Sequence, residues 1–187
     1  MKSYIALLRG INVSGHKIIR MEALRACFEG LGCRSVQTYV QSGNVVFEAR
    51  EKDAVRYADE LSKRIQRDFG FPVPVLLRTS EELEHIVRHN PFLKQPGIDP
   101  AKLHITFLSA PAPKSTAEHL KTLATALEQF HVRGREIYLY CPNGYGRTKL
   151  SNAAIEKKLD AQATTRNWKS VQALVALAHS CGSQVNT

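Results

Sequence analysis

The first 78 residues alternate short apolar runs with helical stretches, and this alternation constrains the fold more than any other feature. The apolar run Tyr4–Leu8 ends at a glycine loop, which is typical of a buried central strand. Two helical stretches and three β-rich runs follow, in the ranges 20–31, 36–40, 45–47, 53–69 and 74–77. The order β-α-β-β-α-β over residues 3–78 is that of a ferredoxin-like unit. In its second helix we expect an inward stripe of Val55, Ala58, Leu61, Ile65 and Phe69.

The second half of the chain predicts a further βαβ unit. A short helix at 81–89 and a linker candidate rich in proline and glycine at 95–100 separate it from the first half. Its strand, helix and strand, and the two helices that close the chain, are expected at 103–108, 116–130, 137–140, 152–159 and 167–181. We therefore expect an α+β protein with a ferredoxin-like subdomain at 1–95. A second α+β subdomain at 101–187 should close on it.

Composition is that of a soluble globular protein. The 187 residues suffice for one domain or for two closely packed halves. The apolar run near the N-terminus is too short for a signal peptide or a membrane span. The cysteines Cys27, Cys33, Cys141 and Cys181 have neither CxxC nor zinc-ribbon spacing, which indicates free thiols in a reducing compartment. We expect a cytoplasmic protein without membrane contacts, and the sequence leaves its oligomeric state open.

The charge distribution favours anionic partners. The net charge is +9, although the lysines and arginines are scattered along the chain rather than clustered. All 17 acidic residues lie outside four windows, residues 1–21, 30–47, 137–155 and 161–187. These acid-free windows include the glycine loop after the first strand and the turn that precedes residues 45–47.

Two loops within these windows are expected to meet in space. In a ferredoxin-like unit the first strand ends at the edge of the sheet where the third begins, so residues 9–15 and 41–44 should converge. Their glycines let backbone amides approach a ligand, and an anion-receptive rim would result. The rim would include the side chains of Asn12, Gln41, Ser42 and Asn44. Alternatively, the glycines serve the turns and the polar side chains satisfy buried backbone groups.

Five segments of the chain resemble the motifs of a known family. They are residues 9–13 (RGINV), 38–47 (TYVQSGNVVF), 90–92 (NPF), 144–150 (GYGRTKL) and 164–168 (TTRNW). Together they resemble the bacterial domain of unknown function 1697 family. The chain departs from that family at Ser14, where a second glycine is usual, and at Thr148, where serine is common. The resemblance implies a fold and a bacterial origin, and it implies no activity.

The glycine loop has the outline of a phosphate-binding P-loop without its chemistry. In residues 10–17 (GINVSGHK), His16 separates the second glycine from Lys17. Ile18 stands where a serine or threonine would bind magnesium. A looser anion-binding role for the same backbone amides stays open.

The sequence predicts no metal site, no cofactor and no catalytic constellation. His85 and His89 stand four residues apart on a helix but lack the glutamate of HExxH and any further ligand. Cys27 lies on the buried face of a helix and is expected to be inert. His16 is the one candidate general base, because its ordinary pKa lies near neutrality.

A basic pair follows the later glycine turn. Arg147 and Lys149 could contact a phosphate, or they could belong to a solvated helix start. No acidic residue occurs between positions 137 and 155 to neutralise them.

The last helix begins near a third cation. Thr165 or Asn167 is a candidate N-cap, and Arg166 then stands at the positive end of the helix dipole. Either a carboxylate such as that of Asp160 or a bound anion could compensate the Arg166 charge. Trp168 could belong to the core or could stack on a base.

These patterns favour a binding module for a phosphate-bearing ligand, either a nucleic acid or a nucleotide. The charge of the ligand would be neutralised by Arg9, Arg147, Lys149 and Arg166, with Asn12, Gln41, Ser42, Asn44, Asn167 and Trp168 as further contacts. One alternative is an enzyme that acts on a small anionic metabolite at the same rim, with His16 as its base. Another is that the motifs are purely structural and join two subdomains.

Overall fold

The α+β class predicted from the sequence is confirmed. The computed structural model describes residues 1–50 and 54–182. It contains two four-stranded antiparallel sheets flanked by helices. Asp53, the expected first residue of the second helix, and residues 183–187 of the expected second subdomain lie outside the described residues.

The chain forms two compact units. Unit 1 comprises residues 1–85 together with the segment that begins at Gln172, and unit 2 comprises residues 86–171. The subdomain ranges 1–95 and 101–187 stay a prediction about folding domains.

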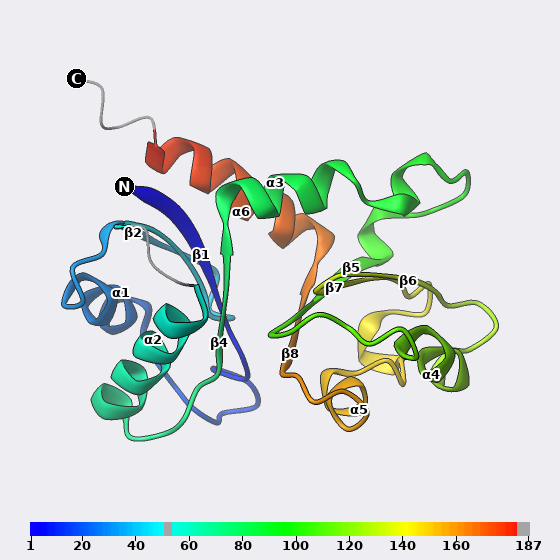
Figure 1. Ribbon diagram of the computed structural model, residues 1–187, viewed down its shortest axis with the longest axis horizontal. Helices are drawn as coiled ribbons and strands as arrows, with labels where there is room; N and C mark the ends of the chain where they lie inside the picture. Colours follow the sequence, from blue (N-terminus) through cyan, green and yellow to red (C-terminus); the bar gives the residue numbers. More distant parts are fainter. Residues whose placement is uncertain (51–53, 183–187) are drawn as a thin grey trace. The chain divides into compact units, whose positions relative to one another are not determined.

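Unit 1 has the element order that the sequence predicts. Its elements are β1 (Lys2–Leu8), α1 (Met21–Glu29), β2 (Arg34–Tyr39), β3 (Asn44–Ala49), α2 (Ala54–Phe69) and β4 (Val75–Thr79). The strands pair antiparallel in the order β2-β3-β1-β4. Both α1 and α2 lie on one face of this sheet (Figure 1). The helix α3 (Ser80–Arg88) begins directly after β4.

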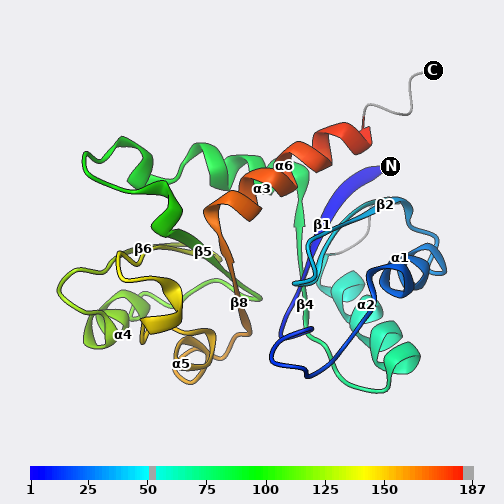
Figure 2. The same ribbon diagram turned by 180° about the vertical axis from the view of Figure 1, so that it is seen from behind.

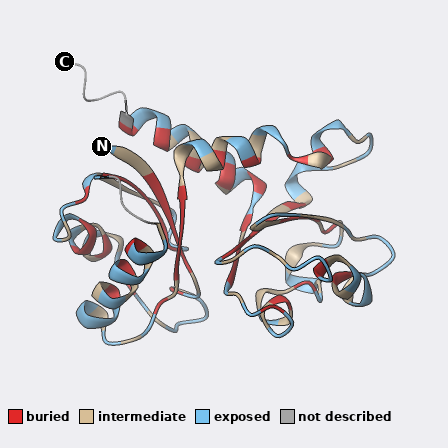
Figure 3. Ribbon diagram, in the orientation of Figure 1, coloured by how far each residue is buried: buried red, intermediate tan, exposed pale blue. Residues whose placement is uncertain are grey.

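The core of unit 1 explains why these residues form these elements. The run Tyr4–Leu8 is buried on both sides of the sheet, and β1 and β4 are buried along most of their length (Figure 3). Between the sheet and the helices, the rings of Tyr4 and Phe47 stack with centroids 5.7 Å apart. The buried stripe of α2 runs through Tyr57, Leu61 and Ile65, at helical spacing.

The expected inward position of Val55 is wrong. This side chain is 64% exposed, whereas Tyr57 is buried. Two residues along an α-helix turn the side chain by about 200°. A stripe centred on Tyr57 therefore places Val55 on the solvent face.

Unit 2 repeats the same element order. Its elements are β5 (Leu103–Leu108), α4 (Thr116–Leu123), β6 (Gln129–Arg133), β7 (Glu136–Tyr140), α5 (Asn152–Glu156) and β8 (Ala163–Asn167). The strands pair antiparallel in the order β6-β7-β5-β8, and α4 and α5 pack on one face (Figure 2). Three short 3-10 helices are η1 (Pro91–Lys94), η2 (Pro100–Lys102) and η3 (Tyr145–Arg147). The helix α6 (Trp168–Gly182) follows β8.

Two strands of unit 2 correct the sequence prediction. The helix expected at 116–130 ends at Leu123, and residues 129–133 form β6. The alanine- and leucine-rich stretch favours a helix locally, but the Glu128 carboxylate accepts a hydrogen bond from the Thr125 amide (2.8 Å) and closes a turn. Residues 163–167, read as the approach to a helix, form the edge strand β8 beside β5. The second half is therefore a complete β-α-β-β-α-β unit rather than a βαβ unit with closing helices.

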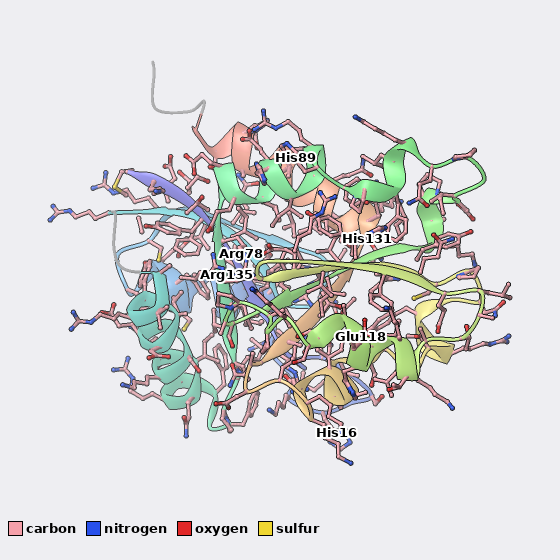
Figure 4. All side chains as sticks on the ribbon, turned by 45° about the vertical axis from the view of Figure 1, so that its right-hand side comes forward. His16, Arg78, His89, Glu118, His131 and Arg135 are labelled. Atoms are coloured by element: carbon pink, nitrogen blue, oxygen red, sulfur yellow. The ribbon has the colours of Figure 1, made fainter. Side chains whose placement is uncertain are left out.

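The strands β4 and β8 carry a buried arginine at the same position of their sheets. Arg78 (labelled in Figure 4) is 1% exposed and lies opposite Ile5 of β1. Arg166 is 8% exposed and lies opposite Ile105 of β5. Each guanidinium donates a hydrogen bond from Nη1 to the carbonyl of the preceding residue, at 2.8 Å and 3.0 Å respectively. The two units therefore share a structural detail as well as a strand order.

We predict that Gly43→Ala destabilises the fold far more than Gly10→Ala. Both glycines have positive φ, 78° and 71°. A Cβ at Gly43 would lie 2.7 Å from Leu8 Cβ, whereas a Cβ at Gly10 would meet nothing within 4 Å. Left-handed strain costs each variant about 1 kcal/mol, and overpacking adds about 2 kcal/mol at Gly43. Urea denaturation measures both losses, and equal losses would contradict this account.

Candidate functional site

The two loops that the sequence expects to converge do meet within unit 1. They are the β1–α1 loop (residues 9–20) and the β2–β3 turn (residues 40–43). Asn12 Nδ2 donates a hydrogen bond to the carbonyl oxygen of Gln41 (2.8 Å). The Leu8 amide donates to the carbonyl oxygen of Gly43 (2.8 Å). The edge of the sheet thus brings together segments about thirty residues apart.

Asn12 also closes the β1–α1 loop on itself. Its Nδ2 donates to the Ile19 carbonyl (3.0 Å), and its Oδ1 accepts from the Ile19 amide (2.8 Å). Asn12 has a φ of 54°, a left-handed conformation that asparagine tolerates better than most residues. These two hydrogen bonds and the one to Gln41 are all made to backbone groups, so the Asn12 side chain shapes the loop.

A cavity of about 250 Å³ adjoins this junction. It is lined by Asn12, Gln41 and residues 18–22. Arg20 occupies the N-cap position of α1, and no side chain caps the helix there. The first turn of a helix has backbone N–H groups without intrahelical acceptors, which makes this end of α1 electropositive.

The cations of this region differ in the hydrogen bonds and ion pairs that they already make. Lys17 Nζ donates to the carbonyl of Pro72 (2.7 Å). Arg25 donates to Thr38 Oγ1 (3.0 Å) and lies 3.7 Å from Glu22. Arg20 is exposed and has no ion-pair partner within the described part of the chain. Arg20 is therefore the cation best able to neutralise a ligand in the cavity.

Ile18 of the cavity lining, and two residues that neighbour lining residues in the sequence, have exposed aliphatic side chains. Val13, Ile18 and Val40 are 57%, 60% and 51% exposed. Val40 has a φ of 50°, which is a genuine outlier for a β-branched residue. Sparsely populated backbone conformations of this kind cluster at functional sites.

Another unit 1 residue predicted for the site, Asn44, stabilises the β2–β3 turn. Asn44 is fully buried, and its Nδ2 donates to the Tyr39 carbonyl (3.1 Å) and to Ser42 Oγ (3.0 Å). The Arg9 amide donates to the carbonyl of Pro74 (2.9 Å). Of the five predicted residues of unit 1, only Asn12 and Gln41 line the cavity.

The remaining predicted residues belong to unit 2. Arg147 and Lys149 are exposed on and after η3. Asn167 Oδ1 accepts a hydrogen bond from the Ser170 amide (2.8 Å), so Asn167 is the N-cap of α6. Trp168 is buried, at 4% exposure, and is part of the core.

Arg166 is buried rather than on an exposed rim. Its Nη1 donates to Thr164 Oγ1 (2.8 Å). Burial lowers the pKa of the guanidinium to about 10, which leaves it protonated at neutral pH.

Sequence reasoning missed a polar cluster on the α4/α5 face of unit 2. Tyr145 Oη donates to Thr165 Oγ1 (3.0 Å), and Thr165 Oγ1 donates to Asn152 Oδ1 (2.7 Å). Thr106 Oγ1 lies 2.7 Å from the same Thr165 oxygen. This network fastens η3 to the sheet. In the sequence, the only sign of this cluster is that alternate residues of the predicted strand, 104, 106 and 108, share one face. Thr165 could not be placed beside them, because β8 was not predicted.

His104 stacks against this network. Its ring lies parallel to that of Tyr145, with centroids 5.0 Å apart and an interplanar angle of 25°. His104 Nδ1 lies 3.2 Å from the Lys102 carbonyl, which favours the tautomer protonated at Nδ1. Burial lowers the pKa of His104, so the ring is neutral at pH 7. By contrast, the predicted base His16 (labelled in Figure 4) is exposed.

Two buried cysteines have raised thiol pKa values. Burial raises the pKa of Cys27 to about 12 and that of Cys141 to about 11, which disfavours the nucleophilic thiolate at neutral pH. The burial of Cys27 agrees with its predicted position on the inner face of α1, and its inertness stays a prediction. Among residues 1–50 and 54–182, no group of three or more His, Cys, Asp or Glu is arranged to hold a metal ion.

Comparison with known proteins decides the family. The family described as protein of unknown function (DUF1697) has a model that matches residues 1–138. The chain belongs to this family. The match includes the β1–α1 loop, the β2–β3 turn and the whole cavity lining, whereas η3, β8 and α6 lie beyond it.

One solved structure has a similar fold along nearly the whole chain. It is the conserved bacterial protein SP0830 from Streptococcus pneumoniae, with a TM-score of 0.74 and 20% sequence identity. The alignment covers 95% of this chain and 98% of that one. At this identity the likeness establishes the fold alone. No curated protein matches the chain. Within the described residues, no helix has the length and apolar character needed to cross a membrane.

We predict that Asn12→Gly destabilises the protein by about 2 kcal/mol, because three side-chain hydrogen bonds are lost. Glycine adopts a φ of 54° without strain, so this variant isolates the hydrogen bonds. Asn12→Ala should lose about 1 kcal/mol more. Chemical denaturation measures both changes. A neutral Asn12→Gly would show that the side chain does not hold the loop.

We predict that His104 titrates below its ordinary pKa and that Tyr145→Ala moves the pKa upward by exposing the ring. Tyr145→Phe keeps the stacked ring and should leave the pKa low. The pKa of His104 is lower in the folded protein than in the unfolded chain. The neutral ring therefore makes its full contribution to the free energy of unfolding above about pH 6.5. This contribution is lost as the pH falls through the folded-state pKa. An NMR titration of the ring protons measures the shift, and an unperturbed pKa in the wild type would refute it.

Proposed function

We propose that this DUF1697 protein binds a phosphate-bearing ligand, a nucleotide or a nucleic acid, in the cavity between the β1–α1 loop, the β2–β3 turn and α1. The observation that carries the proposal is the cavity itself, with Arg20 on its rim. Arg20 supplies a positive charge, and the Asn12–Gln41 hydrogen bond holds the two loops together beside it. A phosphate in this place would also accept hydrogen bonds from the first turn of α1.

Electrostatics around the cavity support an anion more than a cation. Residues 1–21 and 30–47 contain no acidic residue. Glu22 is the one carboxylate in the lining, and its ion pair with Arg25 partly neutralises it. Arg147 and Lys149, which the sequence also suggested as phosphate contacts, are exposed on unit 2 and do not line this cavity.

An enzyme acting on a small anionic metabolite is a second candidate function. His104 favours it, because a neutral imidazole with Nδ1 held by a backbone carbonyl can accept a proton at Nε2. A structural role for Asn12 and Asn44 is supported by their backbone contacts. It is compatible with ligand binding, because the same contacts shape the cavity.

The β-α-β-β-α-β order of both units supports a ferredoxin-like classification. We also propose a cytoplasmic location, which the four free cysteines support.

We predict that Arg20→Ala weakens the binding of inorganic phosphate and of AMP about tenfold, because a charge-assisted hydrogen bond is lost. Glu22→Gln should strengthen binding about threefold, because a like charge is removed. Isothermal titration calorimetry measures both. Lys149→Ala, an exposed cation of unit 2, is the control for net charge alone. Equal losses in Arg20→Ala and Lys149→Ala would reject the cavity as the site.

A further inference from the structure

The cavity is small for the ligands that a basic protein can bind. Its volume is about 250 Å³. Pockets for drug-sized ligands range from about 300 to about 1,000 Å³. A space of this size holds one compact molecule or one end of a larger one. It is not an extended groove that follows a nucleic-acid backbone.

The lining lacks the groups that hold single-stranded nucleic acids. Such sites stack successive bases on aromatic side chains. The described residues that line this cavity, Asn12, Gln41 and residues 18–22, include no aromatic side chain. They include Ile18, Ile19 and Met21. These side chains offer an apolar surface without a stacking platform.

The charge at the cavity is also too small for a polyanion. Arg20 is its one uncommitted cation within the described residues, because Lys17 and Arg25 are engaged elsewhere. Glu22 lines the same cavity and would repel a second phosphate. Nucleic-acid sites neutralise several phosphates with several lysines and arginines. The charges of Arg20 and Glu22 together suit a ligand with one phosphate.

The exposed aliphatic side chain of Ile18 indicates the chemistry of the rest of the ligand. Ile18 lines the cavity at 60% exposure, and Val40, which precedes Gln41 in the sequence, is 51% exposed. A carbon skeleton that covers Ile18 removes apolar surface from water. Asn12 is committed to the backbone, so the Gln41 amide and the Glu22 carboxylate are the polar groups available for hydroxyl or ring-nitrogen contacts.

We propose, resting on the proposed function, that the ligand is a small monophosphate ester rather than a nucleic-acid strand. Its phosphate lies at Arg20, and its carbon body packs against Ile18. A mononucleotide and a sugar phosphate share this chemistry.

The experiment is calorimetric titration of the full chain with inorganic phosphate, ribose 5-phosphate, AMP and an eight-residue oligothymidylate, at 50 and 200 mM salt. The two esters should bind with one-to-one stoichiometry and weaken about threefold at the higher salt, as expected for one phosphate. The oligonucleotide should bind no tighter than AMP. A higher affinity for AMP than for ribose 5-phosphate identifies a mononucleotide, and the reverse identifies a sugar phosphate.

Variants separate the phosphate contact from the contact with the carbon body. Ile18→Ser should weaken the preferred ester about fivefold and leave inorganic phosphate unchanged. Val55→Ser, at an equally exposed valine of α2, should change neither. Arg20→Ala should weaken all four probes. An oligonucleotide that binds at least tenfold tighter than AMP, or an Ile18→Ser variant that binds esters normally, overturns the monophosphate proposal while the cavity function stands. Binding that ignores Arg20→Ala, or an absence of binding by every probe, overturns both.

Discussion

The hydrogen bonds of one asparagine hold the edge of unit 1 in its observed shape. Asn12 connects the β1–α1 loop to Gln41 in the β2–β3 turn and, through Ile19, closes the loop on itself. The chain can enter α1 where it does because Ile19 is held in this way, two residues before the helix begins. A side chain that satisfies three backbone groups replaces the ladder hydrogen bonds that a loop lacks.

The cavity follows from that closure. The loop and the turn form two of its walls and the first turn of α1 forms a third, so the ligand site depends on a contact that is structural. Binding and structural roles of the motif residues are therefore not exclusive alternatives. Asn12 and Asn44 organise the backbone, while Arg20, Ile18 and Gln41 present the groups that a ligand can touch. Unit 2 uses its own polar network, centred on Thr165, to position η3 in a comparable manner.

The sequence predicts the elements of unit 1 because its apolar periods are clear, and it predicts the meeting of the two loops because strand order dictates it. It predicts unit 2 less well. Residues 116–130 have helical propensity throughout, and only the Thr125–Glu128 turn and the pairing of β6 with β7 overrule that propensity. At the site, residue type identifies Asn12 and Gln41. It does not identify Arg20 or Ile18, because their roles come from the path of the chain after the glycine loop. Nor does it separate buried Arg166 from exposed Arg147.

The central claim is that a phosphate-bearing ligand occupies the cavity beside the Asn12–Gln41 junction. The most direct test is to follow backbone and side-chain amide resonances by NMR while inorganic phosphate is added to the full chain. The account predicts saturable shifts confined to Asn12, Gln41 and residues 18–22. Shifts centred on Arg147 and Lys149 instead, or no saturable shift at any amide, would contradict it.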